Sequence, residues 1–256
     1  MPLCMGSSMG RRTVLTLRRS HIAQMIKCPK SYELQHIQKI VMPRPSHLVL
    51  GSGCHHALAG NFNYKLNTGT DMAISDLIDL FSDAWDKLDF GTDENKNRPI
   101  IWDDPKDYLK DVGVLLLKSI HIKYFPILQP LAVEHTFTKE INGIILQSTP
   151  DLITTRGIAD FKTAKRRKSP DDLARDIQPT CHLLVSNSPP DSNYEFYYML
   201  KQKVPTTDMM VAKRSQAALD WFTNELLPPV VRMLETGLFP PLGIGSWLCS
   251  PDYCQY

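Results

Sequence analysis

The chain of 256 residues is long enough for one domain with a sizeable hydrophobic core, and its 43% hydrophobic and 22% charged residues are ordinary for a globular protein. No apolar run approaches the roughly 18–20 residues that a membrane span needs. Residues 1–12 are basic but lack the apolar core of a signal peptide, so we expect a cytoplasmic protein with no membrane partner. The net charge of +2 is nearly neutral, so overall charge does not point to nucleic acid.

The first half of the chain has helical patterns. We expect a loose leader over residues 1–16, followed by one domain over residues 17–256. Ser20 is a plausible N-cap for the first helix, and the residues around it repeat their apolar positions with helical spacing. Helices are expected over residues 21–40, 46–64, 71–88 and 107–124, with a polar loop at 89–104.

Strand patterns begin at Pro130. Asn142-Gly143 is a strong hairpin signal, and Thr155-Arg156-Gly157 predicts a second tight turn. Strands are expected over residues 131–139, 143–153, 157–162, 194–203 and 207–212, helices over 170–185 and 215–235, and an irregular tail over 239–256. This order predicts an α/β fold with a mixed central sheet flanked by helices and an N-terminal helical elaboration.

Two acidic residues and a lysine lie on consecutive expected strands. Asp160 and Lys162 are two residues apart, so they point to the same face of their strand, and a short turn brings Asp151 on the neighbouring strand close to them. Two converging carboxylates suit Mg²⁺ or Mn²⁺, and a nearby lysine can polarise a water molecule or stabilise charge on a phosphate. The spacing alone also fits three charged residues satisfied by surface ion pairs.

Four segments together resemble the RecB-like branch of the PD-(D/E)XK nuclease superfamily, which includes RecB and AddB nuclease domains, CRISPR-associated exonucleases and phage relatives. They occur in the order and spacing of that family. The segments are Gly51 to Leu58 with His55 at the motif position, Pro150-Asp151, Asp160-Phe161-Lys162-Thr163, and Gln178 within Asp176 to His182. His182 stands where the family usually has a tyrosine, and a histidine there could contact a phosphate.

The resemblance implies a restriction-endonuclease-like core and a metal-dependent DNA nuclease, most simply an exonuclease acting on single strands or ends in repair, recombination or phage replication. His55, Asp151 and Asp160 would bind Mg²⁺ or Mn²⁺ with the backbone carbonyl of Phe161, Lys162 would be the catalytic lysine, and Gln178 would position Lys162 or the DNA strand. A helicase or recombinase partner is implied by the same analogy.

Cysteines raise a second question. The opening Ser20 to Tyr32 is also similar to the start of these domains, where many relatives hold an iron–sulfur cluster with one early and three late cysteines. This chain offers Cys28, Cys249 and Cys254, which is one ligand short of a four-cysteine site. Three reduced cysteines without a cluster fit the sequence equally well.

Other residues suggest how DNA would bind. Lys165, Arg166, Arg167 and Lys168 follow the expected site directly and could track a phosphate backbone, although such a run is usually a solvated face. Tyr197, Tyr198 or Trp221 could stack on bases, but aromatic residues are more often core. Two alternatives stay open: a non-catalytic nucleic-acid-binding or assembly module on the same fold, and a redox protein that uses only the cysteines.

Overall fold

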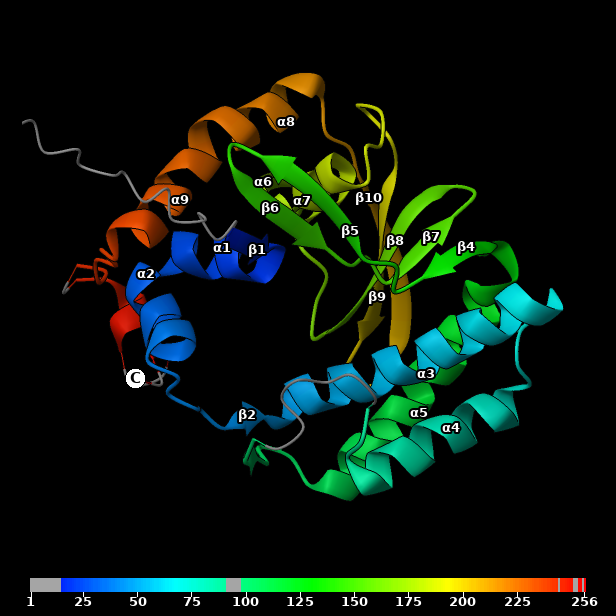
Figure 1. Ribbon diagram of the computed structural model, residues 1–256. Helices are drawn as coiled ribbons and strands as arrows, with labels where there is room; N and C mark the ends of the chain where they lie inside the picture. Colours follow the sequence, from blue (N-terminus) through cyan, green and yellow to red (C-terminus); the bar gives the residue numbers. More distant parts are fainter. Residues whose placement is uncertain (1–14, 91–97, 244, 251–252, 255) are drawn as a thin grey trace, which may run out of the picture.

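A five-stranded sheet forms the centre of the molecule. The computed structural model describes residues 15–90, 98–243, 245–250, 253–254 and 256 (Figure 1). The strand order is β10-β9-β8-β7-β4, and only the β8–β9 pair is parallel. The strands are β4 (Pro130–Val133), β7 (Leu152–Thr154), β8 (Gly157–Ala164), β9 (Tyr194–Leu200) and β10 (Thr206–Ala212). The expected mixed sheet is confirmed.

The two faces of this sheet are covered by different helices. On one face Ala159, Phe161 and Tyr197 join the core of α3 (Ser46–Thr68), α4 (Ile74–Lys87) and α5 (Lys106–Lys123), which gather on one side of the molecule in Figure 1. On the other face Ile158 and Phe196 pack near α6 (Pro170–Arg175) and α7 (Ile177–Val185). Side chains alternate along β8, so Asp160 and Lys162 face the α7 side.

Close packing of α3, α4 and α5 depends on a small residue in α5. A Cβ atom added at Gly113 would lie 2.3 Å from the Phe81 ring, so no larger residue fits without displacing α4. At the end of α3 the backbone turns at Gly69 with φ 79°, a conformation that favours glycine. These two glycines allow α4 to fold back tightly along α3.

A second sheet of three strands lies beside the first. Its order is β1-β6-β5, with β1 (Leu15–Arg18) parallel to β6 (Ile144–Ser148) and β5 (Phe137–Ile141) antiparallel to it. Its apolar face packs on α1 (Arg19–Lys27), α7 and α9 (Leu227–Thr236). The Asn142-Gly143 hairpin is confirmed, with both residues at positive φ. Strand β1 includes Leu15 and Thr16, which the expected leader contained; residues 1–14 lie outside the described part of the chain.

Two of the predicted strands were wrong, because each is divided into two shorter strands. Residues 131–139 form β4 and β5, which belong to different sheets, because Glu134 between them has φ 46° and cannot continue a strand. Residues 143–153 form β6 and β7, separated at Thr149 and Pro150, since proline has no N–H for a ladder bond. The chain therefore crosses between sheets twice, and the second crossing ends at Asp151.

The long first helix predicted over residues 21–40 was also wrong. The chain forms α1, α2 (Pro29–Tyr32) and a π-helical turn η1 (Glu33–Ile37), with Cys28 extended at φ −161°. Cys28 precedes Pro29, whose ring disfavours a helical residue before it. Ser20 is not the N-cap: α1 begins at Arg19, and Arg18 occupies the cap position.

The two C-terminal helices of the prediction are also divided. Asp176 separates α6 from α7 and caps α7 by accepting a hydrogen bond from the Gln178 backbone N–H at 2.9 Å. Residues 215–235 form α8 (Gln216–Trp221), η3 (Phe222–Leu226) and α9. The remaining short elements are β2 (Arg44–Pro45), β3 (Ile100–Ile101), η2 (Phe125–Ile127) and η4 (Trp247–Cys249). No described helix is both long and apolar enough to cross a membrane.

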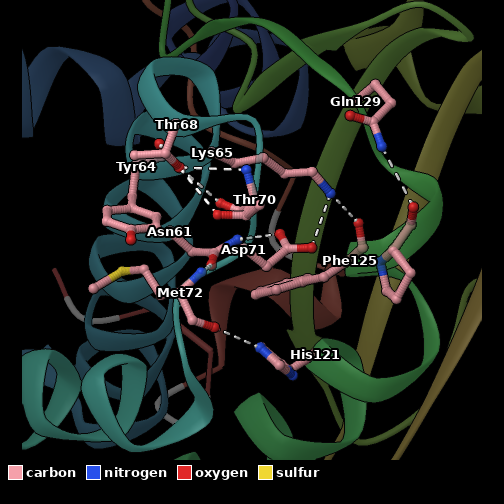
Figure 2. A network of polar contacts seen from close by, with 11 residues as sticks. Asn61, Tyr64, Lys65, Thr68, Thr70, Asp71, Met72, His121, Phe125 and Gln129 are labelled. Atoms are coloured by element: carbon pink, nitrogen blue, oxygen red, sulfur yellow. Dashed lines mark hydrogen bonds and ion pairs between the residues drawn. The ribbon is translucent and has the colours of Figure 1, made fainter.

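Figure 2 shows a polar network that joins the end of α3 to the loop before α4, to α5 and to η2. Lys65 is buried, and its Nζ donates to Asp71 Oδ2 at 2.9 Å and to the Phe125 carbonyl at 2.6 Å. Asn61 donates to Asp71 Oδ1 at 3.0 Å and accepts from the Met72 N–H at 2.8 Å. A buried ammonium is tolerated here because a carboxylate and a carbonyl surround it.

Replacing Lys65 by methionine tests this network. The change removes the Lys65 donor from Asp71 Oδ2 and from the Phe125 carbonyl, so we expect the free energy of unfolding to fall by about 2 kcal/mol in urea titrations. Lys118→Met, at an exposed position of α5, is the matched control and should change stability little. Equal stability of the two variants would contradict the role assigned to Lys65.

Candidate active site

The β7–β8 hairpin brings the two acidic residues of the motif together. Asp151 lies directly before β7 rather than within a strand, and its Oδ2 accepts a hydrogen bond from the Phe161 backbone N–H at 2.7 Å. Leu152 pairs with Ala159 in the antiparallel ladder, which fixes the register that places Asp151 beside Asp160 and Phe161. The N–H and C=O of a strand residue point to the same side, so the Phe161 carbonyl also faces Asp151.

Asp160 is a buried carboxylate with two protein partners. It is only 2% exposed. Gln178 Nε2 donates a short hydrogen bond to its Oδ1, and Lys162 Nζ forms an ion pair with its Oδ2. The Lys162 ammonium is the cation that Oδ2 faces, and among the described residues no donor reaches this oxygen with hydrogen-bond geometry.

His55 approaches from the opposite side of the site. It is carried by α3, and its Nδ1 lies 3.3 Å from Asp151 Oδ1. Burial opposes ionisation of both groups, but their mutual attraction outweighs it, so the pKa of His55 is raised and that of Asp151 is lowered. Burial, and then the charge of Asp151, raise the pKa of Asp160 against the opposing charge of Lys162.

Gln178 belongs to a buried chain of hydrogen bonds behind Asp160. Besides its bond to Asp160, its Nε2 donates to Tyr194 Oη at 3.2 Å, and Tyr194 Oη is 3.0 Å from His182 Nδ1. The resemblance implied that Gln178 helps to position Lys162 or the DNA strand; in the structure it contacts Asp160, the ion-pair partner of Lys162. Burial lowers the pKa of His182 to about 3, so the ring is neutral.

His182 is 4% exposed, so the expectation that it could contact a phosphate is wrong. A tyrosine hydroxyl is nevertheless present beside Gln178, because Tyr194 at the start of β9 accepts from Gln178 Nε2. The prediction missed Tyr194 because it lies in an apolar strand run and has no motif signal of its own.

Glu134 is a second residue that the prediction missed. It lines a small recess at the site together with His55, Leu58, Ala59, Phe62, Asp151 and Phe161. Its backbone N–H donates to the Asp151 carbonyl at 3.0 Å, which fixes Glu134 beside the motif. Burial, and then the charge of Asp151, raise the pKa of its carboxyl. The sequence carries no local signal for it, since it is placed by the crossing between the two sheets.

The donor set suits a divalent cation in its chemistry. Two carboxylates and a backbone carbonyl are oxygen ligands of the kind that Mg²⁺ and Mn²⁺ use, and an imidazole nitrogen can complete such a set; Asp160 Oδ2 now pairs with the Lys162 ammonium. In the described part of the chain, no three His, Cys, Asp or Glu side chains already surround one point in a metal-binding arrangement. Binding an ion here therefore requires side chains that now contact Gln178, Lys162 or His55 to turn toward it.

The basic run after β8, residues 165–168, has two exposed residues and two that form ion pairs. Lys165 and Arg166 are the exposed residues. Arg167 Nη1 lies 3.2 Å from Asp208 Oδ2, and Lys168 forms an ion pair with Asp176. Contact of these residues with DNA stays a prediction.

The predicted base-stacking residues differ in exposure. Tyr197 and Tyr198 are 0% and 2% exposed, so their assignment to base stacking is wrong, whereas Trp221 is 55% exposed on α8. Tyr197 and Tyr198 are core residues, as aromatic side chains in a central strand usually are.

The three candidate cysteines do not form a metal site in the described residues. Cys28 and Cys254 line one recess between α1 and the tail, while Cys249 is exposed in η4. The structure therefore does not support the iron–sulfur cluster that the resemblance suggested.

The comparisons with known proteins agree with this geometry. Residues 19–256 match the PD-(D/E)XK nuclease superfamily. The chain therefore belongs to this superfamily, whose members are nucleases that hydrolyse phosphodiester bonds. No curated protein matches the chain.

A solved structure supports the fold. A candidate exonuclease from Eubacterium rectale is similar with a TM-score of 0.59 and 13% identity, over 99% of this chain and 92% of that one. At this identity the likeness shows the fold, and the restriction-endonuclease-like class predicted from the sequence is confirmed.

His182 gives a testable pH dependence of stability. Its pKa is about 3 in the folded protein and 6.5 as the ordinary value, so its contribution is complete above pH 6.5 and is lost as the pH falls toward 3. Between pH 7 and pH 5 this group alone lowers the free energy of unfolding by about 2 kcal/mol.

We expect His182→Gln to lose about 2 kcal/mol less stability over that interval than the unmodified protein does, measured by urea unfolding at both pH values. His135→Gln, which removes an exposed histidine, should behave like the unmodified protein. The same pH dependence in all three proteins would show that His182 is not buried neutral.

Proposed function

We propose that the protein is a divalent-metal-dependent deoxyribonuclease of the RecB-like branch that acts as an exonuclease on single strands or ends. The observation that carries this proposal is the convergence of Asp151, Asp160 and Lys162 with His55 and Gln178, because five residues from separate segments meet in one site. An iron–sulfur cluster and a helicase or recombinase partner form no part of the proposal.

His55, Asp151, Asp160 and the Phe161 carbonyl would hold Mg²⁺ or Mn²⁺ in this mechanism. The bound ion would lower the pKa of a coordinated water molecule and withdraw charge from the scissile phosphate. The chain must then hold its carboxylates ionised and at fixed positions. Asp151 is held by the Phe161 N–H, and Asp160 by Gln178.

Lys162 supplies a cation beside Asp160 in the site. It pairs with Asp160 on the same face of β8, and its side chain is 30% exposed, so it can reach a phosphate at the surface of the site. An ammonium there stabilises the negative charge that develops on the phosphate oxygens, and it can orient the attacking water. Gln178 is a positioning residue, because it touches Asp160 rather than the reacting atoms.

Two variants and one treatment test the proposal: Asp160→Asn, Lys162→Ala, and removal of the metal from the unmodified protein with EDTA. We expect cleavage of labelled single-stranded DNA with Mg²⁺ or Mn²⁺ to fall by about 100-fold or more in each variant, since each loses a group that stabilises the transition state. Asp79→Asn and Lys118→Ala, both exposed on helices away from the site, are the controls. Cleavage that persists in EDTA or in both site variants would contradict the mechanism.

Gln178→Leu tests the positioning role separately. We expect kcat to fall by about 10- to 100-fold with little change in KM, because the amide orients a ligand rather than binding the substrate. Tyr194→Phe removes only the hydroxyl behind Gln178 and should have a smaller effect on kcat. A rise in KM at constant kcat would instead place Gln178 in contact with the DNA strand.

A further inference from the structure

An open recess lies between α1 and the junction of α6 with α7. We call it the α1–α6 recess. Its lining consists of Ala23, Ile26, Lys27, Lys168, Asp172, Arg175, Asp176 and Ile177. His55, Asp151, Asp160, Lys162 and Gln178 are not among them, although Asp176 and Ile177 begin the segment that carries Gln178.

The lining combines an apolar part with a basic part. Ala23, Ile26 and Ile177 supply the apolar part, and Ile26 is 46% exposed. Lys27, Lys168 and Arg175 supply the cations. An apolar surface beside positive charge suits a nucleotide, whose sugar and base are largely apolar on their faces while its phosphate is anionic.

The carboxylates of the recess are already used within the protein. Asp176 caps α7 and forms the ion pair with Lys168, and Asp172 accepts a hydrogen bond from Ser169 Oγ at 2.7 Å. In contrast, Lys27 and Arg175 are exposed and form no hydrogen bond or ion pair through their side chains within the described residues. Two cations are therefore available for an anionic ligand.

The recess lies close to the candidate active site. Lys168 Nζ lies 5.7 Å from the centre of the Phe196 ring, and Lys162 Nζ lies 5.9 Å from the same centre. Asp176, which lines the recess, is two residues from Gln178, which holds Asp160. A strand whose phosphate contacts Lys162 would therefore bring an adjoining nucleotide to the recess.

We propose that the α1–α6 recess binds the nucleotide next to the scissile phosphate of a single-stranded substrate. The proposal rests on the nuclease function above and adds the path of the substrate strand. The sugar and base lie against Ile26 and its apolar neighbours, and a phosphate is held by Lys27 and Arg175. A base in a duplex is covered by its stacked neighbours and cannot contact the apolar part, so the recess selects an unpaired nucleotide.

Binding measured in EDTA separates this site from catalysis. A fluorescent single-stranded oligonucleotide is titrated with the unmodified protein and with Lys27→Ala/Arg175→Ala. We expect Kd to rise about tenfold, and the slope of log Kd against log salt concentration to fall by about 0.7 for each phosphate contact that is lost. Lys87→Ala/Lys118→Ala removes the same charge from exposed positions of α4 and α5 and should have little effect.

Ile26→Ala tests the selection of unpaired nucleotides. We expect it to weaken binding of the single strand about fivefold, through loss of an apolar contact to the nucleotide, and to leave duplex binding unchanged. Ile122→Ala, at a residue that is 76% exposed on α5, is the matched control. Circular dichroism of all variants checks folding, which these exposed positions should not disturb.

The outcomes distinguish the two proposals. Unchanged binding by both recess variants, together with metal-dependent cleavage by the unmodified protein, would overturn the recess and leave the nuclease function standing. Equal weakening of single-strand and duplex binding by Ile26→Ala would overturn the selection of unpaired nucleotides. An unmodified protein that neither binds nor cleaves DNA would overturn both proposals.

Discussion

The hydrogen bond from the Phe161 backbone N–H to the Asp151 carboxylate is the contact on which the site depends. It crosses the β7–β8 hairpin at 2.7 Å and joins the residue that ends the crossing between the sheets to the strand that carries Asp160 and Lys162. A one-residue slip of this hairpin would turn Asp160 and Lys162 to the opposite face of the sheet. The register therefore decides whether the motif residues meet.

The second requirement is that the buried Asp160 carboxylate is held in place within the site. Asp160 is enclosed by β8, β9 and α7, and burial alone would favour its neutral form. Lys162 and Gln178 oppose this by ion pairing and hydrogen bonding. The site thus gathers negative charge as a metal site does. Lys162 now neutralises Asp160 and His55 neutralises Asp151, and a bound cation would partly replace these two groups.

The sequence predicted those features of the structure that depend on neighbouring residues alone, such as turns and the faces of strands. The Asn142-Gly143 turn, the hairpin at Thr155 and the shared face of Asp160 and Lys162 follow from turn chemistry and strand alternation. The crossings at Glu134 and Pro150 depend on which sheet each segment joins, and a single sequence does not reveal that choice. For the same reason Tyr194 and Glu134 were missed, since each reaches the site only through tertiary packing.

Hydrolysis in water enriched in ¹⁸O tests the central claim most directly, because it reports the bond that the site is proposed to make. The unmodified protein with Mn²⁺ and single-stranded DNA should release nucleotides that carry one ¹⁸O atom on the new phosphate, and Asp160→Asn should release almost none. Release of labelled nucleotides at the same rate by both proteins would contradict the assignment of the active site to Asp151, Asp160 and Lys162.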